Sequence, residues 1–290
     1  MVDVFETVKE IQDKFNIIGR SEEIRKIIIA RSVGKNILIE GDVGVGKTTI
    51  AKAVASYFDS NFYRIDCSEE TLPHNLVGYF DPPLAISKGY NEESYMYGPL
   101  TQAMLKGGCM FINEINRMPE STQNSLLTAL DERIIEIPKL KTIEAKNGFF
   151  TIATQNPAAH IGITILGEAL KDRFIWIKLE YQTREEEIQI ITKEAHFNGS
   201  DSNNIAQISQ EIIELSRKTN YIMRGSSIRG AIDLADIILK SDNQKSSKAW
   251  VEAAIMSLYN KIELEDGVTR SKSEIITDIV LSVLNKADFQ

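Results

Sequence analysis

The stretch Gly41-Asp-Val-Gly-Val-Gly-Lys-Thr-Thr49 decides the fold of this 290-residue chain. Its pattern, Gly-x-x-x-x-Gly-Lys-Thr, is typical of a loop whose backbone N–H groups point inward at a phosphate. In such a loop Lys47 reaches the outer phosphates and the Thr48 hydroxyl binds Mg²⁺. We therefore expect a nucleotide site formed by Gly41, Asp42, Val43, Gly44, Val45, Gly46, Lys47, Thr48 and Thr49.

The residues on either side of this loop fit a strand and a helix. Asn36–Glu40 is a short apolar run of the kind that forms a buried strand. After the loop, apolar side chains recur with helical spacing and share one face: Ile50, Ala51, Val54, Ala55 and Phe58. The phosphates would then lie at a helix N-terminus, where unpaired N–H groups and the helix dipole favour negative charge.

Strand and helix patterns alternate over the first part of the chain, after two short helices at Phe5–Phe15 and from Ser21. This alternation predicts an α/β fold, a parallel sheet covered by helices on both faces. The apolar runs typical of strands are Asn36–Glu40, Phe62–Asp66, Cys109–Asn113, Phe149–Thr154 and Phe174–Leu179.

The strand patterns stop near Tyr181, and only helical patterns follow. We expect a nucleotide-binding domain over residues 1–180 and a small all-α lid domain over residues 181–290. Polar segments at 198–204 and 241–246 are predicted loops. The expected lid helices are Thr183–Phe197, Asn204–Lys218, Ser226–Lys240, Ser247–Leu264 and Ser271–Lys286.

Two segments interrupt the regular alternation. Leu76–Pro99 is rich in glycine, proline and aromatic residues, and we expect a projecting loop or hairpin. The aromatic side chains fit either a surface that contacts another protein or a local cluster that folds the hairpin. Ile134–Ala145 has β-branched residues around Pro138-Lys139 and predicts a second hairpin. The aromatic residues of the first segment are Tyr79, Phe80, Tyr90, Tyr95 and Tyr97.

Polar residues follow two of the predicted strands at their carboxyl ends, where open α/β sheets bind ligands. Cys109–Asn113 is followed by Glu114, our candidate for the base that orients and polarises an attacking water. Asn113 lies beside it, near the expected metal. The strand Phe149–Thr154 leads to Asn156, which we expect to lie near the γ-phosphate.

Two arginines are candidates for stabilising charge on the phosphates. Arg173 precedes the last strand and is placed to act across a subunit boundary, as an arginine finger does. Arg229 opens a predicted lid helix and is placed to reach the phosphates of its own chain. For either arginine taken alone, a surface ion pair is the commoner role.

The order of these motifs resembles the AAA+ ATPases. Glu114-Ile-Asn-Arg117, Thr154-Gln-Asn-Pro157 and the run Leu166–Phe174 resemble the MoxR branch in particular. The likeness extends from about Ile17 to the last lid helices. The branch carries Asp at position 113, where this chain has Asn, so the resemblance implies nucleotide binding more firmly than a normal rate of hydrolysis.

This resemblance implies a role for each candidate residue. Lys47 and Thr48 would be the Walker A residues, Glu114 the Walker B acid, Asn156 sensor 1, Arg173 the trans finger and Arg229 sensor 2. Ile17 and Ile18 would contact adenine, and Thr48 and Asn113 would lie at Mg²⁺. The two interrupting segments would be the helix-2 insert and the pre-sensor hairpin. The resemblance also implies ATP as ligand, a homo-oligomer, usually a hexameric ring, and a partner with a von Willebrand A domain.

Composition bears on several function classes. The formal charge of −8 weighs against general nucleic-acid binding. No apolar run is long enough for a membrane span, and the N-terminus lacks the pattern of a secretory signal. We expect Cys67 and Cys109 to be buried thiols of a cytoplasmic protein, and His74, His160 and His196 form no metal-binding pattern.

Three functions fit the sequence. The first is an ATP-driven, chaperone-like remodeller that assembles or matures protein complexes. The second is a nucleic-acid motor, although the insert carries only Lys88 against Asp81, Glu92 and Glu93. The third is a nucleotide-dependent switch with little turnover, suggested by Asn113.

Overall fold

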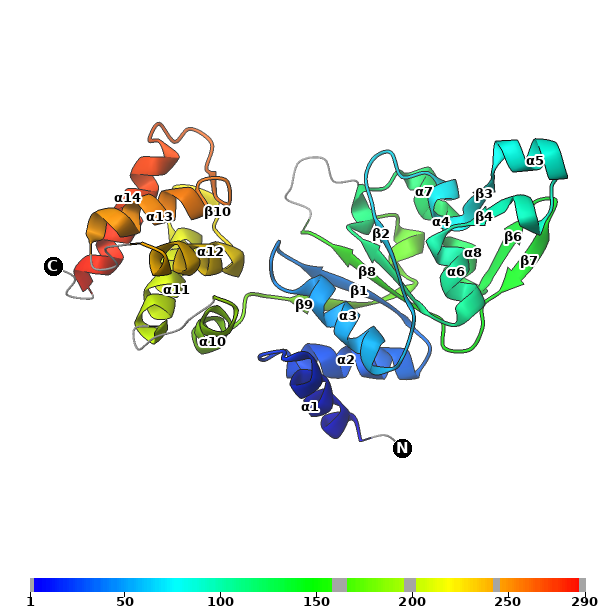
Figure 1. Ribbon diagram of the computed structural model, residues 1–290, viewed down its shortest axis with the longest axis horizontal. Helices are drawn as coiled ribbons and strands as arrows, with labels where there is room; N and C mark the ends of the chain where they lie inside the picture. The colour runs from blue at the N-terminus through cyan, green and yellow to red at the C-terminus, as the bar shows by residue number, and fades with distance from the viewer. Residues whose placement is uncertain (1–2, 158–165, 196–201, 242–245, 287–290) are drawn as a thin grey trace. The chain divides into compact units, whose positions relative to one another are not determined.

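The structure, a computed structural model, describes residues 3–157, 166–195, 202–241 and 246–286 (Figure 1). The chain forms two compact units. One contains Met1–Asp42 and Gly46–Glu180, and the other contains Val43–Val45 and Tyr181–Gln290. His160, His196 and most of the two predicted polar loops lie outside the described residues.

A five-stranded parallel sheet forms the centre of the first unit, in the order β2-β5-β8-β1-β9. The parallel α/β fold expected from the sequence is confirmed. β1 lies between β8 and β9, so the strands that follow it in the sequence are placed on both sides of it. The strand order therefore switches at β1, and parallel sheets bind ligands at such a switch point, beside the loop that follows the strand. The strands are β1 Asn36–Gly41, β2 Phe62–Asp66, β5 Cys109–Asn113, β8 Phe150–Gln155 and β9 Phe174–Leu179.

Apolar side chains of alternate strand positions pack on opposite faces of the sheet. Leu38 of β1 shares a core cluster with Met110 and Ile112 of β5 and with Met104 of α6 (Pro99–Lys106). Ile37 and Ile39 are also fully buried, and α2 (Ser21–Ser32) and α3 (Lys47–Tyr57) contact β1. In Figure 1, α2 and α3 lie on one side of the sheet, and α6, α7 (Glu120–Ser125) and α8 (Leu127–Asp131) lie on the other.

The remaining helices of the first unit connect or cover these strands. α1 Val4–Phe15 packs on α2 Ser21–Ser32, and α3 Lys47–Tyr57 begins at the end of the glycine-rich loop. The others are α4 Pro73–Val77, α5 Pro82–Lys88, α6 Pro99–Lys106, α7 Glu120–Ser125, α8 Leu127–Asp131 and α9 Glu168–Lys171, with short 3₁₀ turns η1 Glu92–Ser94 and η2 Ile115–Arg117.

Both interrupting segments form antiparallel hairpins. β3 Gly78–Phe80 pairs with β4 Tyr95–Tyr97, and β6 Ile134–Ile137 pairs with β7 Lys141–Glu144. The sequence did not indicate α5 between β3 and β4, because its two prolines predict a break in helical structure. They occupy the first turn of the helix, where no N–H is needed, and Asp81 caps it.

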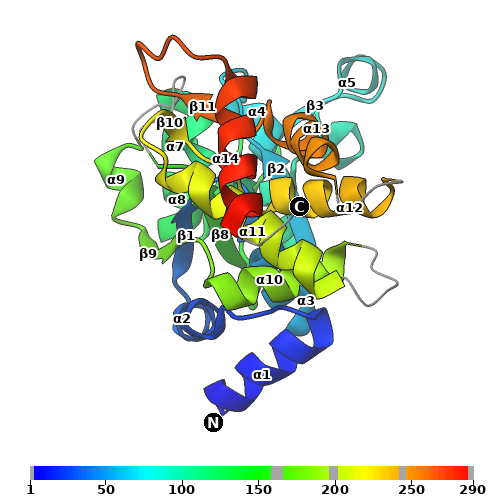
Figure 2. The ribbon, with the colours of Figure 1, turned by 90° about the vertical axis from the view of Figure 1, so that its left-hand side faces the viewer.

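The second unit is helical. Its helices are longer or shorter than expected by a few residues, and α13 ends at Leu258 rather than continuing to Leu264. It also contains a short antiparallel pair, β10 Ile222–Arg224 and β11 Glu263–Leu264, that the sequence did not indicate. Figure 2 shows the bundle, in which α14 packs on α11 and α13. The helices are α10 Arg184–Glu194, α11 Ser202–Lys218, α12 Ile228–Leu239, α13 Ser247–Leu258 and α14 Lys272–Lys286.

Gly78 is the glycine on which the first hairpin depends. Its φ is +120°, and a Cβ there would lie 2.2 Å from the Met96 carbonyl oxygen. We expect Gly78→Ala to open the hairpin, so that limited proteolysis cuts residues 78–97 faster than in the wild type. Gly89→Ala is the matched control, because Gly89 also has a positive φ but faces open space. Equal cleavage of the two variants would contradict this prediction.

Candidate functional site

The lysine of the glycine-rich loop is held inside it. The side chain of Lys47, in the first turn of α3, is buried, with the residue only 9% exposed. Its ammonium donates to the carbonyl oxygens of Gly41 at 2.5 Å and Asp42 at 2.9 Å, and to Asn156 Oδ1 at 2.8 Å. Gly44 and Gly46 have φ of +87° and +92°, which glycine adopts without strain. The loop is therefore curled around the lysine.

Asn156 connects this lysine to the strand-end acid. Its Oδ1 accepts from Lys47, and its Nδ2 donates to Glu114 Oε1 at 3.2 Å. The ammonium has only donors and the carboxylate only acceptors, so the amide can satisfy both in one orientation alone. Asn156 is 5% exposed, and its carbonyl accepts from Asn116. Three residues proposed from the sequence thus lie together in one hydrogen-bonded row.

The backbone of Glu114 turns sharply at the end of β5. Its φ of 55° and ψ of 50° are in the left-handed region, which costs a non-glycine residue about 1 kcal/mol. The turn is held by the Glu114 N–H, which donates to Thr154 Oγ1 at 3.0 Å. The free carboxylate oxygen pairs with Arg117 Nε at 2.7 Å. Such conformations cluster at functional sites.

Asn113 is bound on both sides of its amide. Its Oδ1 accepts from Thr154 Oγ1 at 2.9 Å, and its Nδ2 donates to Asp66 Oδ1 at 2.8 Å. Asp66 ends β2 and lies directly beside Asn113 in the sheet register. Arg64 binds the same carboxylate through two nitrogens. The family that this sequence resembles has an aspartate at position 113. Here the acid is Asp66, on the adjacent strand.

The pKa values of the neighbouring Asp66 and Cys67 are shifted in opposite directions. The Arg64 guanidinium, helped by the Asn113 amide, lowers the pKa of Asp66, so this carboxylate is ionised near neutral pH. Burial, with smaller contributions from Asp66 and Glu114, raises the pKa of Cys67 to about 12. Cys67 is therefore a neutral thiol beside the site. Cys67 and Cys109 are both free and buried, as expected.

The other residues proposed for this site lie in three different parts of the chain. Thr48 is half-buried in the first turn of α3, and Thr49 next to it is exposed. Ile17 and Ile18 are half-buried in the connection between α1 and α2. Arg229 is exposed in the first turn of α12, in the second unit.

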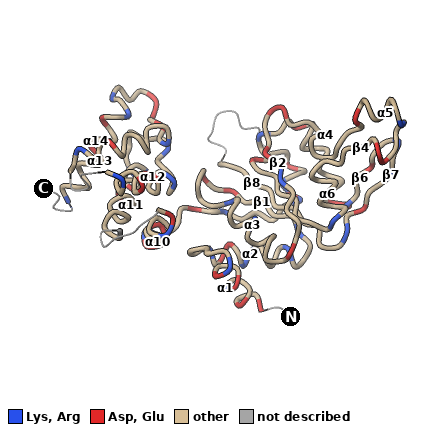
Figure 3. Tube along the Cα trace, viewed as in Figure 1, with Lys and Arg blue, Asp and Glu red and all other residues tan. Residues whose placement is uncertain are grey.

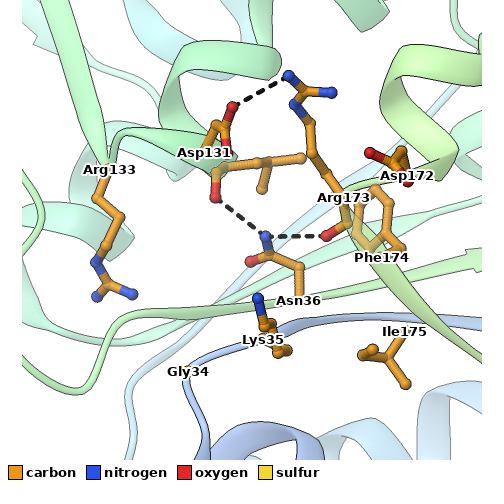
Figure 4. Close-up of a pocket in the computed structure, with 10 residues that line it drawn as sticks. Gly34, Lys35, Asn36, Asp131, Arg133, Asp172, Arg173, Phe174 and Ile175 are labelled. Atoms are coloured by element: carbon orange, nitrogen blue, oxygen red, sulfur yellow. Dashed lines mark hydrogen bonds and ion pairs between the residues drawn. The ribbon is translucent and has the colours of Figure 1, made fainter.

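Arg173 lies away from this group, at the opposite end of the sheet. It lines a cavity of about 390 Å³ with Lys35 and Arg133 (Figure 4). Its guanidinium pairs with Asp131 at 3.1 Å and donates to the Ala169 carbonyl. The cavity lies where β1 and β9 begin, since Asn36 donates to the carbonyl of Arg173. Arg173 is therefore not brought to the loop of its own chain.

The two hairpins contact each other through charged and aromatic side chains. Lys141 of β7 pairs with Glu92, and the Lys139 ammonium lies 4.5 Å from the centre of the Tyr90 ring. Within the first hairpin, Phe80 packs edge-on against Tyr90 and Tyr95. The aromatic residues thus form a local cluster. Some apolar side chains of this segment remain exposed: Tyr79, Ile86, Tyr90 and Met96.

Sequence reasoning missed Asp66, Thr154 and Arg117 as members of the site. The signal for Asp66 was present, because a polar residue at the end of a strand meets those of neighbouring strands at one edge of a parallel sheet. Strand order was needed to use it, since β2 and β5 are far apart in the chain. Arg117 lies one helical turn after Glu114, a spacing that favours ion pairs.

In the part of the chain that the structure describes, no three His, Cys, Asp or Glu side chains are grouped as a metal site. No helix in the described ranges is long and apolar enough to cross a bilayer.

Comparison with known proteins identifies the family. Residues 36–176 match the ATPase family associated with various cellular activities (AAA). YojN of Bacillus subtilis (strain 168) is 31% identical over 213 residues, which cover 72% of this chain and 69% of YojN. This chain belongs to the AAA ATPase family. Nucleotide binding follows from that membership, and the expected P-loop AAA+ fold is confirmed.

Solved structures agree on the fold. A candidate ATPase from Cytophaga hutchinsonii has a TM-score of 0.54 and 25% identity, covering 96% of this AAA protein and 94% of that chain. A RuvB variant from Thermotoga maritima has a TM-score of 0.52 and 20% identity, covering 94% of this chain and 72% of RuvB. At that identity the second likeness concerns the fold alone.

Lys47 allows a direct test of the loop. We expect Lys47→Ala to weaken ATP binding by about 10- to 100-fold, because a charge-assisted hydrogen bond to a phosphate is lost. Calorimetric titration with ATP and magnesium measures this. Lys52→Ala, on the exposed side of the same helix, is the control and should bind like the wild type. Equal affinity of the Lys47 variant would remove the loop from nucleotide binding.

Proposed function

We propose that this AAA protein is a magnesium-dependent ATPase of the MoxR branch, which uses hydrolysis to remodel other proteins during assembly or maturation of complexes. The observation that carries the proposal is the row Lys47–Asn156–Glu114. It joins a phosphate-binding lysine to an acid through an amide of fixed orientation. Such an arrangement suits hydrolysis, which needs the terminal phosphate and a water-activating group side by side.

The residues present fit a magnesium ion carried by the nucleotide. Mg²⁺ prefers oxygen ligands and is often held by one or two protein groups together with phosphates, so a dedicated cage is not needed. The Thr48 hydroxyl and the Asn113 amide oxygen are the groups proposed to lie at the ion, with the ionised Asp66 beside Asn113. Bound there, Mg²⁺ would neutralise charge on the phosphates.

The proposed catalytic roles follow from the hydrogen bonds. Glu114 is proposed to accept a proton from the attacking water, and its left-handed turn ends the strand at that residue. Its two present partners, Arg117 and Asn156, occupy both carboxylate oxygens. We infer that water activation requires one of these contacts to be exchanged. When a nucleotide binds, Lys47 is proposed to turn from Asn156 toward the phosphates, and Asn156 is then proposed to bind the γ-phosphate.

The position of Arg173 supports action on a neighbouring subunit. Phe174 pairs with Asn36 and Leu179 with Gly41, so Arg173, one residue before Phe174, lies six residues along the strand from the start of the loop. At about 3.3 Å per residue that is ~20 Å, further than the side chain extends. Arg173 therefore has no route to the phosphates bound by its own loop, and we propose that it completes the site of an adjacent copy. AAA proteins commonly form such rings, and six is the number proposed here.

The remaining site residues are proposed by resemblance. Ile17 and Ile18 would contact adenine, and Arg229 would bind the phosphates from the lid. Hydrolysis would change these contacts and move the lid. The exposed apolar residues of the first hairpin, with Ile86 at 88% exposure, are the proposed contact for a protein client. A von Willebrand A-domain protein is the proposed partner.

Charge argues against the nucleic-acid motor, the second candidate function. The RuvB likeness shows only a shared fold. Figure 3 shows both acidic and basic residues along the trace of the two hairpins. Lys88 and Lys141 there are paired with Glu93 and Glu92. A groove that follows a phosphate backbone needs uncompensated positive charge.

A slow nucleotide switch is the third candidate. It is suggested by Asn113, which lacks the charge of the family's aspartate. The acid on the next strand, Asp66, and the intact row from Lys47 to Glu114 favour an enzyme over a switch.

Glu114→Gln separates binding from hydrolysis. We expect the turnover number for ATP to fall by about 10²- to 10⁴-fold, as for the loss of a general base, while ATP affinity stays within about threefold. Phosphate release and calorimetry measure the two quantities. The control is Glu120→Gln, an exposed glutamate in α7. Unchanged turnover in the Glu114 variant would exclude it as the base.

Mixing two inactive variants tests the finger. Arg173→Ala should lower turnover by about 10³-fold or more, because the transition-state charge loses its partner. A Lys47→Ala subunit has a weakened nucleotide site of its own but still offers its arginine. When the two variants are mixed, turnover should rise above that of either alone. A mixture as inactive as its components, in rings shown to have exchanged subunits, would contradict action in trans.

A further inference from the structure

The amide of Asn113 has only one orientation that satisfies its neighbours. On one side the Glu114 N–H donates to Thr154 Oγ1, so the hydroxyl hydrogen is free to donate onward to Asn113 Oδ1. On the other side the Asp66 carboxylate can only accept, so the amide nitrogen must face it. The hydrogen bonds therefore run in one direction from Glu114 through Thr154 to Asn113, and from Asn113 to Asp66.

We propose that Asp66 is a positioning residue that lets asparagine serve at position 113. By taking the amide N–H, Asp66 turns the oxygen of Asn113 toward Thr154, where the family's aspartate would present an oxygen. The Thr154 hydroxyl in turn holds the Glu114 backbone in its left-handed turn. The negative charge of the pair is kept, but it lies on β2 rather than on β5.

This arrangement makes an acid at 113 incompatible with Asp66. Asn113→Asp alone would place two carboxylates with oxygens about 2.8 Å apart in place of the present hydrogen bond. Two carboxylates so close both lack a donor and repel each other, with Arg64 on the far side of Asp66 as their shared cation, so the hydrogen bond between the two strand ends is lost. Restoring the family residue is therefore expected to harm this chain, whereas exchanging the two residues preserves one acid and one amide.

The inference rests on the proposed ATPase but has its own readout. Asp66→Asn and Asn113→Asp should each lower the melting temperature of the nucleotide-free protein, and the double variant should recover most of the loss. In ATPase assays each single variant should reduce kcat by about 10- to 100-fold, as is usual for groups that orient ligands of a metal site. The KM for ATP should change less, because Lys47 and its loop are untouched.

Two variants serve as controls. Asp59→Asn makes the same chemical change at an exposed aspartate and should behave like the wild type. Arg64→Gln removes the other partner of Asp66. If Asp66 only formed a surface ion pair, Arg64→Gln would match Asp66→Asn in effect, and the exchange of residues would rescue nothing.

The outcomes separate the two proposals. Loss in both single variants with recovery in the exchanged pair, in melting temperature and in kcat, supports the positioning role. A faster enzyme from Asn113→Asp alone, or losses that simply add in the double variant, would overturn it. If the wild type hydrolyses no ATP, the proposed function fails, yet the melting temperatures still decide whether residues 66 and 113 act as a pair.

Discussion

The burial of one ammonium group constrains the rest of the site. Lys47 is nearly enclosed, and a buried charge is costly unless each of its donors finds an oxygen. Two come from the loop's own carbonyls, which fixes the curl of the backbone. The third comes from Asn156, which brings the end of β8 to the loop and fixes its amide toward Glu114. The curl of the loop and the placement of the acid thus both follow from satisfying a single cation.

The sheet order makes this possible. β8 lies between β1 and β5. Asn156, which directly follows β8, therefore has the loop that follows β1 on one side and Glu114, which follows β5, on the other. Its amide side chain contacts both. Adding β2 beyond β5 brings Asp66 to the same edge. The opposite end of β9 bears Arg173, which is why one subunit contains parts of two sites if the proposed trans action holds.

Much of this was predictable from the sequence, because the signals were local. The strand Asn36–Gly41, the helix after Lys47 and the hairpin at residues 134–144 follow from periodicity and turn residues. The helix α5 was missed because proline usually breaks a helix, whereas both prolines here lie in the first turn, where proline is tolerated. Asp66 was missed because its meaning depends on strand order, which neither spacing nor composition encodes. The ion pair of Arg117 with Glu114 required the left-handed turn, which no residue type at 114 suggests.

The site contains two asparagines that are oriented in the same way, which supports the proposal that Asn113 serves where the resemblance implies an acid. An amide has a donor end and an acceptor end, so its neighbours decide which end faces which way. Asn156 is oriented by a cation and a carboxylate, and Asn113 by a hydroxyl and a carboxylate. In each case the carboxylate accepts from the amide N–H, so the amide oxygen faces the donor on the other side, Lys47 for Asn156 and Thr154 for Asn113. An asparagine beside a fixed acid therefore presents the same atom as an aspartate, with its charge held on the adjacent strand.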